Sequence, residues 1–146
     1  MKQISGTWFE VKVRYEQTQE DGTEKMVTET YVYKAADFGE AFDKAVKHMS
    51  TYTRGEFGIT AMKIAQYGEI VMQDDRTEEK YYRVKVIFIT LNEKTNKEKK
   101  TACHYLVNAD SVEKARKYAD TILSDSMVDF VIEAVQEAKI CDICLD

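Results

Sequence analysis

The chain contains an internal repeat that relates its first half to its second. Three pairs of segments share this relation: residues 8–13 with 81–86, 30–35 with 104–109, and 57–70 with 130–143. Matching residues are separated by the same number of positions in the first and third pairs, and by one more position in the second pair. One hairpin loop therefore differs between the two halves by a single residue. A repeat of this length exceeds a solenoid unit, and it therefore predicts one structural unit that occurs twice.

The bulk composition predicts a soluble globular protein. The chain has 146 residues, of which 44% are hydrophobic and 32% charged, and its net charge is −5. The acidic balance disfavours broad electrostatic capture of nucleic acid. No apolar run is long enough to span a membrane, and an odd number of cysteines does not suggest a disulfide framework. We therefore expect a cytoplasmic protein without membrane association.

Alternating apolar residues predict a long hairpin at the start of each half. One face of the first strand would carry Phe9, Val11, Val13 and Tyr15. Asp21 and Gly22 then supply a turn that accepts positive φ, and the alternation resumes as far as Tyr33. In the second half, similar alternation flanks a turn near Asn96, a residue that tolerates the left-handed region.

Two helices are predicted, near residues 38–49 and 111–124. In both segments apolar residues recur at helical spacing. Asp37 begins a capping-box pattern (Asp-x-x-Glu) ahead of the first helix, and Asp110 begins the same pattern ahead of the second. Each helix should therefore start directly after its acidic residue.

The last segment of each half, residues 57–66 and 128–138, is predicted to be a long, bulged strand. Gly58, Ile59 and Thr60 disfavour a helix in the first copy, and both copies should share one fold.

These elements together predict an α+β fold built from two tandem strand-strand-helix-strand repeats. The repeats would span residues 1–73 and 74–146, with a boundary in the polar run 73–80, and would form one compact pseudo-two-fold domain. Both helices would pack on the same face of an antiparallel or mixed sheet.

Residues 82–101, which begin Tyr-Arg-Val-Lys-Val-Ile-Phe-Ile, and residues 137–143, Glu-Ala-Lys-Ile-Cys-Asp-Ile, carry a family resemblance. They resemble a family of small uncharacterised proteins, a domain of unknown function of gut Bacteroidetes-type bacteria and their phages. The resemblance extends over nearly the whole chain and implies a phage- or mobile-element-associated setting. It brings no activity and no catalytic residues to this chain.

Cys141 and Cys144 form a CxxC pair, a spacing found in zinc sites and redox dithiols. The repeat places Gly68 and Val71 at the matching positions, so the fold can be built there without thiols. Side chains three apart on an extended strand also face opposite ways. We therefore expect a structural role and no cofactor, with zinc binding and redox chemistry as the alternatives.

No cluster of residues in the sequence indicates a particular catalytic reaction. His48 and His104 are the only histidines, and neither has an adjacent acid–base partner in the sequence. Dinucleotide, phosphate-loop, nucleophile-elbow and zinc-protease motifs do not occur. The sequence favours a non-enzymatic protein, with a small hydrolase or metal enzyme as the most distant alternative.

The face opposite the apolar positions suggests nucleic-acid binding as an alternative function. In each half this face would carry one aromatic ring and two cations: Trp8, Lys12 and Arg14, then Tyr81, Arg83 and Lys85. Rings that stack on bases and cations that contact phosphates are what a single strand requires. The other interpretation is a solvated face held by cross-strand ion pairs.

Ile87 and Ile89 interrupt the polar character of this face in the second half. Exposed apolar rows are usually covered, so we expect the rest of the chain or a second subunit to lie over them. The whole sequence thus predicts a cytoplasmic binding or accessory protein. Its partner would be an unknown protein or a second copy, with single-stranded or structured nucleic acid as the alternative ligand.

Overall fold

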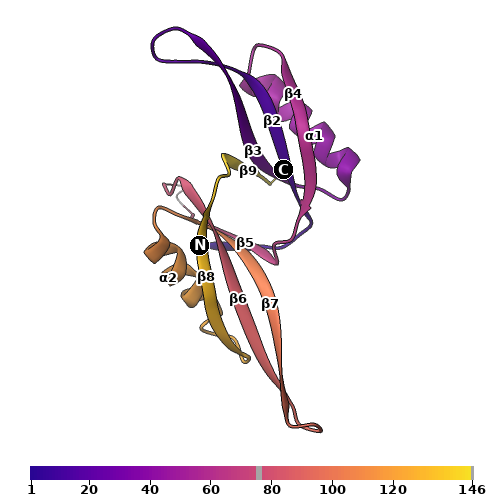
Figure 1. Cartoon of the computed structure of the whole chain (residues 1–146), viewed down its shortest axis with the longest axis vertical. Helices are drawn as coiled ribbons and strands as arrows, with labels where there is room; N and C mark the ends of the chain where they lie inside the picture. The colour runs from indigo at the N-terminus through magenta and orange to yellow at the C-terminus, as the bar shows by residue number, and fades with distance from the viewer. Residues whose placement is uncertain (75–76, 146) are drawn as a thin grey trace. The chain divides into compact units, whose positions relative to one another are not determined.

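The computed structural model describes residues 1–74 and 77–145 (Figure 1). The elements in chain order are β1 (Lys2–Ile4), β2 (Trp8–Thr18), β3 (Glu24–Lys34), α1 (Phe38–Tyr52), β4 (Phe57–Ala65), β5 (Glu69–Met72), β6 (Lys80–Asn92), β7 (Lys97–Ala109), α2 (Val112–Leu123), β8 (Asp129–Ala138) and β9 (Asp142–Cys144). Asp75 and Arg76, within the predicted boundary run, and Asp146, at the end of the predicted second repeat, lie outside the described residues.

The described residues form two compact units, each with its own sheet and helix. The β2 unit comprises Gly6–Ala65 and the described part of Ile140–Asp146, and the β6 unit comprises Met1–Ser5 and the described part of Gln66–Lys139. The predicted α+β class and mixed sheets are confirmed, because each sheet contains parallel and antiparallel pairs. The prediction of one sheet carrying both helices is wrong, because α1 packs on β2 and β3 whereas α2 packs on β6, β7 and β8.

The β2 unit is a sheet with the strand order β4-β2-β3-β9 (Figure 1). β2 and β3 form the predicted hairpin, in which Gly22 takes a φ of 86° that glycine adopts without steric strain. Ala45 and Met49 of α1 share a core with Val11 and Val13 of β2. This is the apolar face that the alternation predicted.

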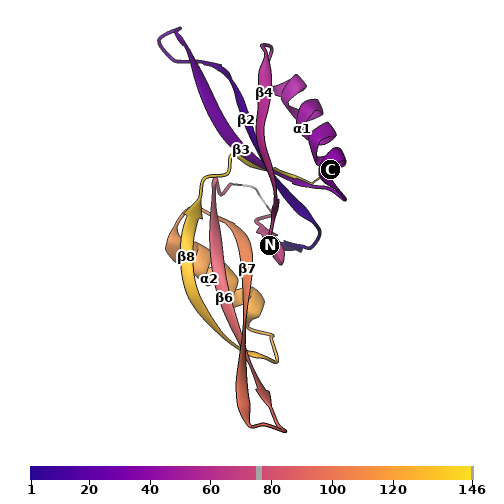
Figure 2. The same cartoon turned by 45° about the vertical axis from the view of Figure 1, so that its right-hand side comes forward.

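The β6 unit is a sheet with the strand order β1-β5-β7-β6-β8. Figure 2 shows β7, β6 and β8 of this sheet side by side. β6 and β7 form the second predicted hairpin, and Asn96 in its turn has a φ of 56°. Ala115 and Ala119 of α2 pack in one core with Val84 and Val86 of β6. Each hairpin runs on beyond the helix of its own unit (Figure 2), so its tip is exposed on both faces.

Both helices are confirmed, but the cap of the second differs from the prediction. The Asp37 carboxylate accepts from the Glu40 N–H at 2.8 Å, as predicted. The N-cap of α2 is Ser111, whose hydroxyl accepts from the Lys114 N–H at 3.2 Å. Asp110 instead accepts from the Glu79 N–H at 3.0 Å. Serine caps a helix about as well as aspartate, which frees Asp110 for this other contact.

The predicted long strands of both late segments are confirmed as β4 and β8, each with an irregularity in its pairing. The register of β4 against β2 shifts between Lys12 and Val13, and that of β8 against β6 shifts between Lys85 and Val86. The two shifts fall at matching positions of the sequence repeat. A bulge bends an edge strand and makes it a poorer template for unwanted pairing.

The sequence analysis missed a short strand after each of these long ones. β5 pairs in parallel with β7, where Glu69 lies opposite Tyr105, and β9 pairs in parallel with β3, where Asp142 lies opposite Tyr31. Residues 1–73 therefore supply β5 to the sheet of the β6 unit, and residues 74–146 supply β9 to the sheet of the β2 unit. We call β5 and β9 the exchanged strands.

Within residues 1–74 and 77–145, no helix has the length and apolar content needed to cross a membrane.

Candidate functional site

The two aromatic residues predicted to stack on nucleic acid are not on the surface. Trp8 is 0% exposed and Tyr81 is 5% exposed. The Trp8 indole N–H is buried and makes no hydrogen bond within the described part of the chain. The predicted exposure is therefore wrong, because strand alternation gives the face on which a ring lies but not whether that face is covered.

The four predicted cations lie in different surroundings. The Arg83 guanidinium donates to the Tyr67 hydroxyl at 3.1 Å and lies 5.6 Å from the centre of that ring. The Lys85 ammonium is 3.3 Å from a Glu133 carboxylate oxygen. Both belong to the β6 unit, whereas Lys12 and Arg14 are exposed on the β2 unit. The structure thus divides the predicted set between two sheets.

Ile87 and Ile89, the predicted partner contact, are half-buried on the outer face of β6. Ile87 lies opposite Val131, which is 51% exposed, and Leu91 further along is 59% exposed. These side chains form an apolar row, as the alternation implied. Contact with a partner at this row stays a prediction.

The CxxC cysteines occupy different surroundings. The Cys141 thiol is partly exposed and lies 2.7 Å from a Glu29 carboxylate oxygen, whereas Cys144 packs against the core of the β2 unit. Burial and the hydrogen bond to Glu29 raise the pKa of Cys141 to about 12. The thiol is therefore protonated at neutral pH, a poor state for a nucleophile or a metal ligand.

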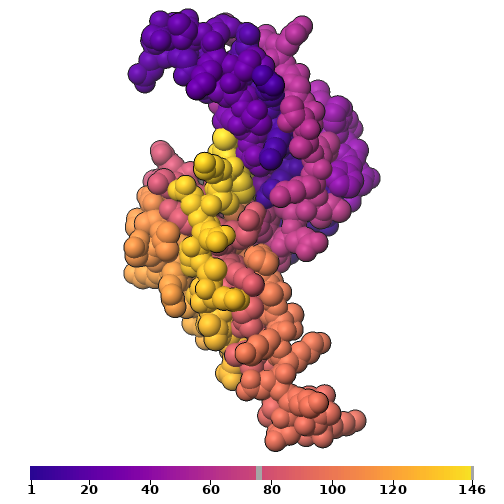
Figure 3. Space-filling model, viewed as in Figure 1, coloured from indigo at the N-terminus to yellow at the C-terminus, as the bar shows by residue number. Residues whose placement is uncertain are grey.

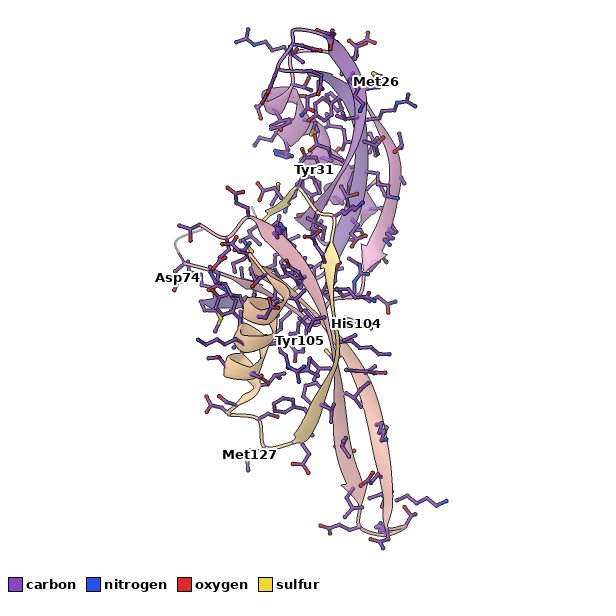
Figure 4. All side chains as sticks on the ribbon, turned by 60° about the vertical axis from the view of Figure 1, so that its left-hand side comes forward. Met26, Tyr31, Asp74, His104, Tyr105 and Met127 are labelled. Carbon is purple, nitrogen blue, oxygen red and sulfur yellow. The ribbon has the colours of Figure 1, made fainter. Side chains whose placement is uncertain are left out.

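A cluster of polar aromatic side chains lies between the hairpin and α1 of the β2 unit. Its members, which we call the tyrosine cluster, are Tyr15, Tyr31, Tyr33, His48 and Tyr52. The Tyr33 hydroxyl is 2.8 Å from His48 Nδ1, and the Tyr15 hydroxyl donates to Glu29. Tyr31 lies on the part of β3 that pairs with β9 (Figure 4). The cluster thus links both hairpin strands to the helix.

Three of the five corresponding positions of the β6 unit are apolar, whereas Tyr105 matches Tyr31 and a polar residue matches Tyr52. Phe88, Val107 and Ile122 occupy the places in the repeat that match Tyr15, Tyr33 and His48, and they pack in or against the core of that unit. The same arrangement of strands and helix therefore forms without polar side chains at these three positions. Buried hydroxyl and imidazole groups destabilise a core unless they are hydrogen-bonded. Tyr15, Tyr33 and His48 carry such groups in one unit only, which points to a role other than folding.

An open pocket of about 670 Å³ adjoins this cluster. Its walls come from the end of β2, the start of β3 and the end of α1: Tyr15, Glu16, Gln17, Thr18, Glu24, Tyr52, Thr53, Arg54 and Gly55. We call it the tyrosine pocket. The Tyr52 ring is 55% exposed and its centre lies 5.9 Å from that of Tyr15.

Carboxylates outnumber cations in the walls of the tyrosine pocket, with Glu16 and Glu24 against Arg54. Glu16 and Glu24 approach closely enough to hydrogen-bond, and this contact raises the pKa of Glu16. Two carboxylates in contact repel each other unless a proton or a cation lies between them. Aromatic faces and carboxylates both attract cations, so the pocket is suited to a positively charged group.

Two phenols of the tyrosine cluster have raised pKa values. Burial, followed by the hydrogen bond to Glu29, raises the pKa of Tyr15, and burial likewise raises the pKa of Tyr31. Both phenols therefore stay protonated, and that of Tyr15 donates a hydrogen bond to Glu29. Among the residues that the structure describes, no group of three or more histidine, cysteine, aspartate or glutamate side chains could hold a metal ion.

The sequence analysis missed the tyrosine pocket, although a signal was present. His48 and Tyr52 are four residues apart and so lie on one face of α1. Alternation places Tyr15 on the face of the sheet that this helix covers. A comparison of the two repeats would have shown that Tyr15 and His48 are matched by the apolar Phe88 and Ile122.

The sequence matches the family described as "Domain of unknown function (DUF4494)" over residues 7–146. Comparison with curated proteins and with solved structures gave no match.

Proposed function

The chain belongs to the DUF4494 family, and we propose that it is a non-enzymatic binding protein whose tyrosine pocket receives a cationic group of a partner. The observation that supports this most directly is the combination of two tyrosine rings and two close carboxylates around one open pocket. The ammonium of a lysine side chain fits this chemistry, because its aliphatic stem packs on a ring while its charge meets a carboxylate.

The proposal places the protein in the cytoplasm. Cys103, Cys141 and Cys144 are all free thiols, and thiols persist in a reducing compartment. The setting among gut bacteria and their phages, which the sequence resemblance implies, stays a prediction.

We also infer that the two repeats arose by duplication of one unit. The pairing of β4 shifts between Lys12 and Val13, and that of β8 shifts at the matching place in the second repeat. The Gly68 N–H donates to the His104 carbonyl and the Cys141 N–H donates to the Thr30 carbonyl, each at 2.8 Å. These two hydrogen bonds lie directly before the exchanged strands, at matching positions of the repeat. The repeats 1–73 and 74–146 thus remain our proposed division of the sequence.

Titration with a lysine-rich peptide tests the binding function. An unstructured peptide of alternating lysine and threonine should bind at low salt, as measured by calorimetry. Tyr52→Ala and Glu16→Gln should each weaken binding about two- to fivefold, since an exposed cation–π contact contributes about 0.5–1 kcal/mol. Binding should also weaken as the pH falls through the raised pKa of Glu16, because the cation must then displace a proton.

Glu113→Gln is the matched control, because it removes an exposed carboxylate from α2 of the other unit. It should leave the affinity unchanged. Equal binding of a glutamate-rich peptide, or equal loss in the control variant, would contradict a cation site at the tyrosine pocket.

Single-stranded or structured nucleic acid is the second candidate ligand. The observation that favours it is the outer face of the β2 unit. There the exposed Lys12 lies opposite Thr30 and Ala61, and the exposed Arg14 lies opposite Thr28 and Gly58. Small side chains beside two cations would admit a phosphate backbone, although the buried Trp8 cannot stack on a base.

Fluorescence anisotropy with labelled single-stranded DNA at several salt concentrations tests this second candidate. Lys12→Ala should reduce the log–log salt slope by about 0.7 for each phosphate that the variant no longer neutralises. Trp8 emission should stay constant during the titration because the ring is enclosed. No anisotropy change at low salt would remove nucleic acid as a ligand of this face.

A further inference from the structure

The tips of the two hairpins carry opposite charges. The tip of the β2–β3 hairpin, residues 16–25, contains Glu16, Glu20, Asp21 and Glu24 against the single cation Lys25. The tip of the β6–β7 hairpin, residues 90–101, contains Lys94, Lys97, Lys99 and Lys100 against Glu93 and Glu98. We call them the acidic arm and the basic arm. Both tips protrude from the body of their own units (Figure 3).

The two arms occupy the same place in their units, so the fold does not dictate the charge of either. Glu16, at the start of the acidic arm, matches Ile89 in the second repeat, directly before the basic arm. Lys94, Lys97, Lys99 and Lys100 are exposed, and none pairs with a carboxylate within the part of the chain that the structure describes. Four unpaired ammonium groups on one tip give it a local field that attracts an acidic surface.

The acidic arm forms one wall of the tyrosine pocket, through Glu16, Gln17, Thr18 and Glu24. The exposed Tyr52 ring lines the same pocket as Glu16 and Glu24. A lysine side chain suits such a lining, because its stem packs on apolar surface while its ammonium meets a carboxylate. The tyrosine pocket is acidic, and the protruding basic arm of this chain carries the complementary charge.

We propose that the basic arm of one copy of this chain docks into the tyrosine pocket and acidic arm of a second copy. The proposal rests on the proposed function, since it names the cationic partner of the same pocket. The two contacting surfaces differ, so the contact is heterologous, and association continues to larger assemblies unless a ring closes it. Exposed charges carry most of the contact, so it weakens as salt screens them.

Sedimentation velocity over a hundredfold range of protein concentration tests the proposal. At low salt the average mass should rise with concentration, and at about 0.5 M salt it should stay at that of one chain. Lys97→Glu with Lys99→Glu in the basic arm should weaken association about tenfold or more, because attraction becomes repulsion. Arg116→Glu with Lys117→Glu on the exposed side of α2 reverses as many charges and should have little effect.

A mixing experiment separates specific docking from general charge effects. The arm variant, Lys97→Glu with Lys99→Glu, and the pocket variant, Glu16→Lys with Glu24→Lys, should each stay monomeric alone. Their mixture should associate, because the pocket variant retains a basic arm and the arm variant retains an acidic pocket. Failure of the mixture to associate, or an average mass independent of concentration in the unaltered chain, would overturn the proposal.

Binding of the lysine–threonine peptide shows whether self-association alone has failed or the proposed binding function has failed as well. The arm variant keeps an unaltered tyrosine pocket, so the peptide should bind it as it binds the unaltered chain. Peptide binding by a chain that stays monomeric at every concentration would refute self-association and leave the cation site standing. Absence of peptide binding would refute both.

Discussion

Ile143→Ala should strongly destabilise the sheet formed by the first half of the sequence. Ile143 lies in the exchanged strand β9, is 2% exposed and pairs in register with Val32 of β3. Truncation of a fully buried isoleucine to alanine destabilises a protein by about 2–5 kcal/mol, through lost burial and the cavity that remains. In a unit of this size that corresponds to a fall in melting temperature of roughly 10 °C or more.

Ile70→Ala should have an effect of the same size on the other unit. Ile70 lies in β5, is 0% exposed and pairs with Leu106 of β7. Amide hydrogen exchange resolves the two cases: protection should fall mainly in β3 for Ile143→Ala and mainly in β7 for Ile70→Ala. Each substitution thus acts on the sheet built by the opposite half of the sequence.

Ile64→Ala is the control for both substitutions, because this isoleucine of β4 is 52% exposed. It should change the free energy of unfolding by less than about 1 kcal/mol, as an exposed side chain loses little burial. If Ile143→Ala lowered protection in β6 and β7 rather than in β3, the exchange of short strands would be refuted.

The elements that the sequence predicted correctly are those with a local signal. α1 begins where Asp37 caps it, and the two hairpin turns fall at Gly22 and Asn96, where the backbone needs a positive φ. These signals depend on residues within a few positions of one another. For the same reason the change from strand to helix periodicity placed both helices within a few residues of their observed bounds.

The exchanged strands could not be predicted in this way. β5 and β9 are only four and three residues long, and each pairs in parallel with a strand from the other half of the chain. Neither carries enough residues for a period to emerge, and parallel partners are joined by long connections rather than by a turn. The prediction of a single sheet failed with them, because it treated each half as complete.

Only part of the candidate site could be predicted from the sequence. Lys12 and Arg14 are exposed as predicted, whereas Trp8 on the same face is buried. Alternation assigns these residues to one face but cannot say where along the strand that face is covered. The tyrosine pocket depends on the end of α1 lying beside the hairpin, which brings Tyr52 to Tyr15 although the two are far apart in the sequence.

Neither half of the chain should fold stably alone, and the two halves should fold when mixed. A break after Gln73 separates residues 1–73 from residues 74–146. It removes β5 from the β6 unit and β9 from the β2 unit without altering any strand. In β5 alone, Ile70 and Val71 are 0% exposed and Met72 is 4% exposed.

Burial of each such side chain contributes about 1.5–3 kcal/mol. Loss of all three therefore approaches the total stability of a typical domain, about 5–15 kcal/mol. β1 is lost from the β6 unit as well, because it pairs only with β5 in the described structure. The isolated second half would keep β6, β7, β8 and α2 but would expose the edge of β7 that β5 covers.

Circular dichroism and amide NMR spectra of the separate and mixed halves test this prediction. Each half alone should lack a cooperative thermal transition, whereas an equimolar mixture should regain one, because each fragment then supplies the strand that the other needs. Ile143→Ala in the second fragment is the internal control, since it weakens β9 and should lower the affinity of the fragments about thirtyfold or more, which corresponds to at least about 2 kcal/mol. A first half that melts cooperatively alone, with β3 protected from exchange, would show that β9 contributes little and that each repeat is an independent folding unit.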